Sequence, residues 1–138
     1  MENSSNTVPR VPYDSEGYLI FSVSSANEAL PIENASIRIV GADAQNGSVE
    51  YNLITDRSGK TERIALKTPS KALSLSPGTP YGFSRYNATV MKEGYYTQTF
   101  LGLPVFEGVT SIQPALLVAN APYNTDSFDP SNENTFTE

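Results

Sequence analysis

The chain has 138 residues, of which 38% are hydrophobic, and a formal net charge of −6. This length suits one domain with one modest core. The sequence contains neither Cys nor His, which excludes disulfides, thiolate nucleophiles, Cys- or His-based metal sites, and Ser-His-Asp or Cys-His catalysis.

Residues 1–16 are expected to form a flexible polar N-terminal arm, because Ser, Asn and Pro dominate and no periodicity is present. The arm lacks the basic and apolar regions of a secretory signal, so we expect synthesis in the cytoplasm. Val8, Val11 and Tyr13 are spaced apolar side chains of the arm that could fill a groove at the sheet edge of a neighbouring subunit by strand addition. Two prolines limit such a contact to a short one.

Residues 17–122 show a succession of short strands. Apolar side chains alternate with polar ones, as in Leu19, Phe21 and Val23, and no stretch of ten residues keeps a helical period. The expected strands are 17–26, 34–42, 48–56, 61–66, 85–92, 96–103 and 110–119. About seven short strands separated by turn residues predict an all-β, antiparallel β-sandwich.

The stretch TDRSGKT, residues 55–61, ends like a phosphate-binding loop. That loop requires a glycine five residues before Gly59, where Ile54 stands, and a helix after the lysine, where the sequence alternates like a strand. We therefore predict a hairpin turn, with Asp56 bonding its own backbone and Gly59 in the left-handed conformation. Asn46-Gly47 predicts a second tight turn.

Residues 67–84 predict a long loop rich in Pro, Gly and Ser, and residues 123–138 an acidic polar C-terminal tail. The tail has a net charge of −4, and Phe128 and Phe136 are its isolated apolar points. The middle of the chain is neutral and no strongly basic stripe is present, so we expect no nucleic-acid partner. No apolar run approaches the ~20 residues that span a bilayer, so we expect no membrane partner.

Four segments in succession carry a family resemblance: ALPIENASIRI (29–39), TDRSGKT (55–61), YNATVMKEGY (86–95) and VFEGVTSIQP (105–114). Together they resemble the carboxypeptidase-regulatory-like family, a transthyretin-like (prealbumin-like) sandwich related to Cna B-type repeats. The variety is similar to domains found with clostridial spore cortex-lytic and peptidoglycan-binding proteins. The resemblance covers about residues 17–122 and implies a non-enzymatic module without cofactor. It carries over no catalytic, cofactor-binding or metal residue.

The aromatic residues near the long loop and the Gly94 turn have two interpretations. Tyr86 and Tyr95 are expected to pack the sandwich, with their hydroxyls reaching backbone groups. Tyr81, Phe83 and Tyr96 are expected to be more open. They either complete the structure or form a contact surface on which sugar rings or a protein partner could stack.

The sequence therefore favours a non-enzymatic structural or assembly module. We expect a subunit that builds or decorates a spore, cell-envelope or virion particle, with protein neighbours in a homo- or hetero-assembly. The alternative is a glycan- or peptidoglycan-binding accessory domain.

Overall fold

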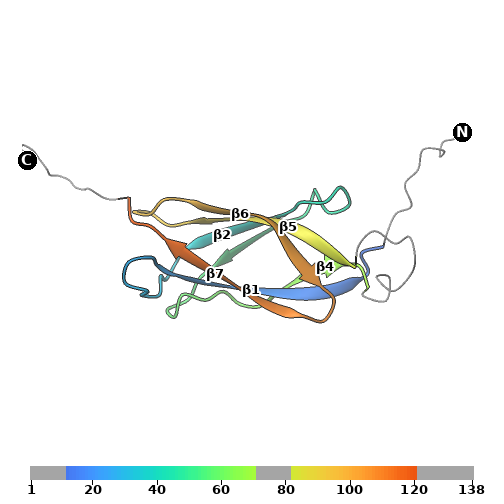
Figure 1. Cartoon of the computed structure of the whole chain (residues 1–138), viewed down its shortest axis with the longest axis horizontal. Coiled ribbons are helices and arrows are strands. Elements are labelled where there is room, and N and C mark those ends of the chain that lie inside the picture. Colours follow the sequence, from blue (N-terminus) through green and yellow to red (C-terminus); the bar gives the residue numbers. More distant parts are fainter. Residues whose placement is uncertain (1–11, 71–81, 121–138) are drawn as a thin grey trace, which may run out of the picture.

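The computed structural model describes residues 12–70 and 82–120 (Figure 1). Over these residues the chain forms two packed β-sheets and no helix. The strands are β1 (Ser15–Ser25), β2 (Ser36–Gly41), β3 (Glu50–Ile54), β4 (Ile64–Thr68), β5 (Phe83–Met91), β6 (Gln98–Phe106) and β7 (Thr110–Leu117). The prediction of an all-β sandwich with seven strands is confirmed.

The two sheets differ in size. Sheet A has three strands in the order β4-β1-β7, and sheet B has four in the order β3-β2-β5-β6. All neighbouring strands are antiparallel except β1 and β7, which run parallel over eight residue pairs from Tyr18↔Thr110 to Ser25↔Leu117. The sequence did not predict this parallel pair, because strand patterning carries no information on the direction of a distant partner.

Several strand boundaries differ from those expected. β4 begins at Ile64 rather than at residue 61, and it continues to Thr68, inside the segment predicted as loop. β5 begins at Phe83, also inside that segment, because Phe83 pairs with Phe106 across the β5–β6 ladder. β6 occupies 98–106 instead of 96–103, and it accommodates Pro104 because it is an edge strand.

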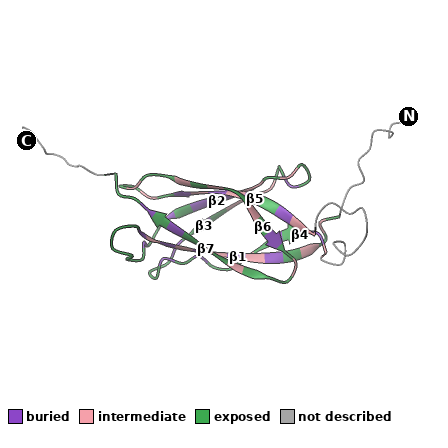
Figure 2. Cartoon of the chain, in the orientation of Figure 1, coloured by how far each residue is buried: buried purple, intermediate pink, exposed green. Residues whose placement is uncertain are grey.

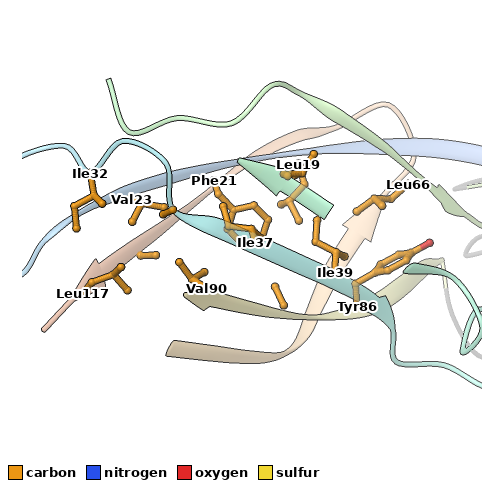
Figure 3. Packing of buried hydrophobic residues seen from close by; sticks show 14 of the residues in the cluster. Leu19, Phe21, Val23, Ile32, Ile37, Ile39, Leu66, Tyr86, Val90 and Leu117 are labelled. Atoms are coloured by element: carbon orange, nitrogen blue, oxygen red, sulfur yellow. The ribbon is translucent and has the colours of Figure 1, made fainter. Parts of the chain in front are cut away.

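The core lies between the sheets. Leu19, Phe21 and Val23 of β1 face Ile37 and Ile39 of β2, and all five are at most 2% exposed (Figure 3). Buried and more exposed residues alternate along β1 (Figure 2), as expected for a strand whose one face packs inward. The other buried apolar residues are Ile32, Ala35, Leu53, Leu66, Tyr86, Ala88, Val90, Val105, Ala115 and Leu117.

The predicted packing of two tyrosines is confirmed. Tyr86 is fully buried between the sheets, and its hydroxyl donates to the Lys67 carbonyl oxygen at 2.6 Å. Burial raises the pKa of Tyr86 above its usual value. Tyr95 is partly buried and packs against the core.

Candidate partner-binding surface

The residues of the TDRSGKT stretch form a closed turn. The Asp56 Oδ1 atom accepts hydrogen bonds from the Ser58 N–H at 2.9 Å, the Ser58 hydroxyl at 2.8 Å and the Lys60 N–H at 3.1 Å. These bonds hold the pKa of Asp56 below its usual value, because they favour the charged carboxylate. Strand β4 follows where a phosphate loop needs a helix. The prediction of a tight turn is confirmed, but the prediction that it closes a hairpin is wrong, because β3 belongs to sheet B and β4 to sheet A.

The two threonines of this stretch attach the turn to the sandwich. The buried Thr55 hydroxyl donates to the Ile32 carbonyl at 2.7 Å and accepts from the Ala35 N–H at 2.9 Å. The Thr61 hydroxyl accepts from the Phe21 N–H at 3.0 Å. These polar atoms are satisfied by buried backbone partners, so their role is structural and they offer no ligand site.

Asn46 does not form the tight two-residue turn that its Asn-Gly dipeptide predicts. It is only 3% exposed, and its side chain accepts from the Asp43 N–H at 2.8 Å and donates to the Arg85 carbonyl at 3.2 Å. The β2–β3 connection is therefore longer, running from residue 42 to 49, and it folds back onto the start of β5. The competing interaction with β5 could not be predicted from the dipeptide alone.

The expected aromatic surface is not assembled. Phe83 begins β5 and packs on Phe106 with ring centroids 5.2 Å apart, whereas Tyr96 follows the far end of that strand. Eight residue steps along β5 span about 26 Å, so Phe83 and Tyr96 lie near opposite ends of the sandwich. Tyr96 is 62% exposed. Tyr81 lies outside the described residues.

One residue of the predicted strand-addition arm is engaged by its own domain. The Tyr13 hydroxyl donates to Asp43 Oδ2 at 2.9 Å, and Asp43 Oδ1 is 2.8 Å from Arg85 Nε. Burial and the bond to Asp43 raise the pKa of Tyr13 well above its usual value. Tyr13 is thus held against the β2–β3 connection and β5. Val8 and Val11 lie outside the described residues.

The structure reveals an exposed apolar surface that sequence reasoning missed. From Ile112 of β7 to Val118, directly after the strand, every second residue points outward from sheet A, and these residues are apolar rather than polar. Ile112 is 61% exposed, Leu116 53% and Val118 51%, while the intervening Ala115 and Leu117 are buried. We call this set the apolar row: Ile112, Pro114, Leu116 and Val118.

Next to the apolar row, the outer face of sheet A becomes polar on β1 and charged on β4. On the adjacent strand β1, the half-buried Ile20 pairs with Ile112 and Ser22 pairs with Pro114. On the far strand β4, Lys67 Nζ is 3.5 Å from Glu16 Oε2. Just before that strand, the Arg63 guanidinium lies 4.2 Å from the centre of the Tyr18 ring, a cation–π arrangement. One face thus combines an apolar side with a cationic side.

The free edge of β7 is closed to strand addition near its middle. The carbonyl oxygens of Val109 and Leu117 accept hydrogen bonds from the N–H groups of Tyr18 and Ala26, so the backbone of these odd-numbered residues faces β1. The Val118 carbonyl oxygen faces away from β1 and accepts from the Tyr96 N–H. In a parallel ladder alternate residues face alternate sides, so the backbone of Pro114 faces the free edge. Proline has no N–H to offer there. Its carbonyl already accepts from Gln113 Nε2 at 2.9 Å, so a partner would meet the face of sheet A.

The outer face of sheet B is different. It presents an ion pair between Arg38 Nε and Glu50 Oε2 at 2.8 Å and three exposed apolar side chains, Ile54 of β3, Met91 of β5 and Leu101 of β6. Its exposed or half-exposed positions include Ser36, Asn52, Thr89 and Thr99. The apolar side chains of sheet B lie on three different strands, and Ser36 separates Ile54 from Met91. On β7 they form one continuous run, and such a run marks an interaction surface. This continuity of the apolar row singles out sheet A.

Two pockets lined by described residues lie near the end of the sandwich where β7 finishes. One has a volume of about 250 Å³ and is lined by Ser25, Ala26, Asn27, Glu28, Tyr95, Leu117 and Ala119. The other, of about 450 Å³, is lined mainly by polar residues of the β2 start and the β5–β6 connection. Within residues 12–70 and 82–120, no group of three Asp or Glu side chains could hold a metal ion. Nor do these ranges contain a helix that could span a bilayer.

Comparison with known proteins finds no matching family model and no matching curated protein. Solved structures do match. The TIE protein of Bacillus anthracis aligns with a TM-score of 0.51 and 14% identity, over 76% of this chain and 17% of that chain. Catechol 1,2-dioxygenase from Acinetobacter sp. ADP1 aligns with a TM-score of 0.53 and 13% identity, over 86% of this chain and 56% of that chain.

A third match, from Bacteroides uniformis, is a provisional carbohydrate-binding protein. It has a TM-score of 0.49 and 6% identity over 74% of this chain and 41% of that chain, which is too weak to carry an argument. This chain spans less than two thirds of the length of each of these proteins. At such identities the first two matches show a shared β-sandwich fold and nothing about activity.

Proposed function

We propose that this chain is a non-enzymatic β-sandwich that binds a protein partner through the outer face of sheet A, as a subunit of a larger assembly. The observation that carries the proposal is the apolar row, where Ile112 and Leu116 are more than half exposed on one strand. Each Å² of apolar surface that is removed from contact with water stabilises the complex by about 25 cal/mol. A partner on this face would gain that free energy.

The finer identity of the module is part of the same proposal. The four segments that resemble carboxypeptidase-regulatory-like domains fall on the strands and turns of the sandwich, which supports a transthyretin-like domain. A spore, cell-envelope or virion particle is the setting that we propose, with the chain made in the cytoplasm. The hydrogen bonds of the Thr55 and Thr61 hydroxyls to backbone groups support a structural role for the TDRSGKT stretch.

The test is the association state of the full chain. We expect light scattering coupled to size-exclusion chromatography to detect oligomers that grow with concentration, and the variant I112S/L116S to shift them to monomer. The matched control is Ile54→Ser, since Ile54 is 63% exposed but lies on the edge strand β3 of sheet B. A strict monomer at high concentration would contradict a self-assembling subunit, and equal effects of the two variants would contradict the assignment to sheet A.

Glycan binding is the second candidate, because Tyr96 is 62% exposed and an open tyrosine ring can stack on a sugar. Retention of the chain on purified peptidoglycan tests it. We expect Tyr96→Ala to release the chain and Phe83→Ala to leave retention unchanged, because Phe83 packs on Phe106 at the other end of the sandwich. Absence of retention, or equal retention of both variants, would contradict this candidate.

A further inference from the structure

We propose that residues 121–138 of one copy bind the outer face of sheet A of a second copy. This inference rests on the proposed function and names the partner of the same surface. It joins two features: an exposed apolar row beside cations, and a segment of the same chain in which aromatic side chains stand beside carboxylates.

The segment has the complementary composition. Phe128 lies next to Asp129 and two residues after Asp126, and Phe136 lies two residues before Glu138. The segment carries no Lys or Arg. Each phenylalanine can therefore contact an apolar surface while its neighbouring carboxylates reach cations beside that surface.

Sheet A supplies those cations. The described residues 57–67 contain four bases and one acid, a net charge of 4 − 1 = +3. All four bases are exposed in the turn or on the outer side of β4: Arg57, Lys60, Arg63 and Lys67. Lys60 pairs with Ser22 of β1, which pairs with Pro114 of β7, so Lys60 and the nearby Arg63 lie two strand spacings from the apolar row, about 10 Å. Lys67 pairs with Glu16, before the ladder with β7 begins, and lies farther away. Attraction between opposite charges at this range steers association, and added salt weakens that attraction.

The dimensions also agree. The apolar row extends over six residue steps from Ile112 to Val118, about 20 Å in a strand. Phe128 and Phe136 are eight steps apart, about 26 Å when extended. One segment in an extended conformation can therefore place its two phenylalanines near the two ends of the row.

The path of the chain favours a second copy over the same one. The Val118 carbonyl accepts from the Tyr96 N–H at 2.9 Å, and the Asn120 N–H donates to the Gly94 carbonyl at 2.9 Å. Gly94 and Tyr96 belong to the connection between β5 and β6 of sheet B. Residue 120 is thus bonded to the sheet B connection, beyond the end of sheet A, and its continuation would have to reverse direction to cover its own row. Binding in trans gives a closed dimer when two copies exchange their segments, and rings or filaments when each segment binds the next copy in turn.

The experiment compares full chains by sedimentation velocity across a concentration series. We expect F128S/F136S to weaken self-association at least tenfold, and the control F128L/F136L to retain it, because Leu keeps the apolar contact. We also expect self-association to weaken as the salt concentration rises. Unchanged association of F128S/F136S would overturn the inference.

A second measurement locates the contact. A synthetic peptide of residues 121–138, titrated into the full-length F128S/F136S chain labelled with ¹⁵N, should shift amide signals of β7 and β4. Shifts confined to sheet B, or none, would overturn the inference. If I112S/L116S abolishes assembly while F128S/F136S does not, sheet A remains the interface and only the assignment of its partner fails. If neither variant changes the assembly, both proposals fail.

Discussion

The backbone N–H of Val23 donates to the carbonyl oxygen of Gly59 at 2.7 Å, which fastens the turn after β3 directly to the central strand of sheet A. Gly59 has a φ of 80°, and a Cβ atom built on it would lie 2.4 Å from the Val23 carbonyl oxygen. Both the conformation and the available space require glycine at this position.

The first prediction concerns this contact. We expect Gly59→Ala to lower the free energy of unfolding by about 3 kcal/mol, of which about 1 comes from the left-handed conformation and the rest from overpacking. Gly94→Ala is the matched control, because Gly94 has a φ of 90° but no neighbouring atom within 4 Å of the new Cβ. It should lose only about 1 kcal/mol. Urea denaturation measures both, and equal losses would contradict the role of the contact.

The second prediction concerns the buried Thr55 hydroxyl. Thr55→Val keeps the shape of the side chain but leaves the Ala35 N–H and the Ile32 carbonyl without their partner, which should cost about 2 kcal/mol. Thr55→Ser retains the hydroxyl and should cost less. The surface substitution Thr99→Val should change stability by less than about 0.5 kcal/mol. A larger loss for Ser than for Val would show that methyl packing, and not hydrogen bonding, determines the residue at this position.

The third prediction is a pH dependence. The pKa of Asp56 is lowered in the folded state, so its carboxylate stabilises the fold fully above the unfolded pKa of about 3.9. This contribution is lost as the pH falls through the folded pKa. The stability difference between wild type and Asp56→Ala should therefore be constant from pH 5 to 8 and shrink below about pH 4. A difference that grows on acidification in urea titrations would contradict this.

The fourth prediction concerns the edge of sheet A. Pro114→Thr restores a backbone N–H on the free side of β7 and should promote irregular edge-to-edge association, seen as increased turbidity on warming. The control Ile112→Thr alters an outward side chain of the same strand without adding a backbone donor, and its turbidity should not rise. Equal behaviour of the two variants would contradict the blocking role that we assign to Pro114.

Local patterning predicted much of the fold. The alternation of Leu19, Phe21 and Val23 determines which face of β1 is buried, and the structure confirms it. The turn at Asp56 and Gly59 also followed from local chemistry, because both act within a few residues of chain. The parallel pairing of β1 with β7 could not be predicted, since it depends on contacts between the two ends of the domain.

The candidate surface was missed for a related reason. The segment after Gln113, PALLVA, is apolar on both faces of its strand, a pattern typical of strands covered on both sides. Sequence patterning alone does not show that β7 lies at an edge with its outer face open. That asymmetry becomes visible only once Ala115 and Leu117 are seen to face the core while Leu116 faces solvent.

The parallel arrangement of β1 and β7 determines how the domain would respond to mechanical force. The chain enters through β1 at one end of the sandwich and leaves through β7 at the other (Figure 1). Tension applied at residues 12 and 120 pulls the two strands in opposite directions along their shared ladder. All ladder hydrogen bonds from Tyr18 to Ser25 would then bear load together in shear instead of separating one by one, as in a zipper. We therefore expect the domain to resist stretching between these two residues.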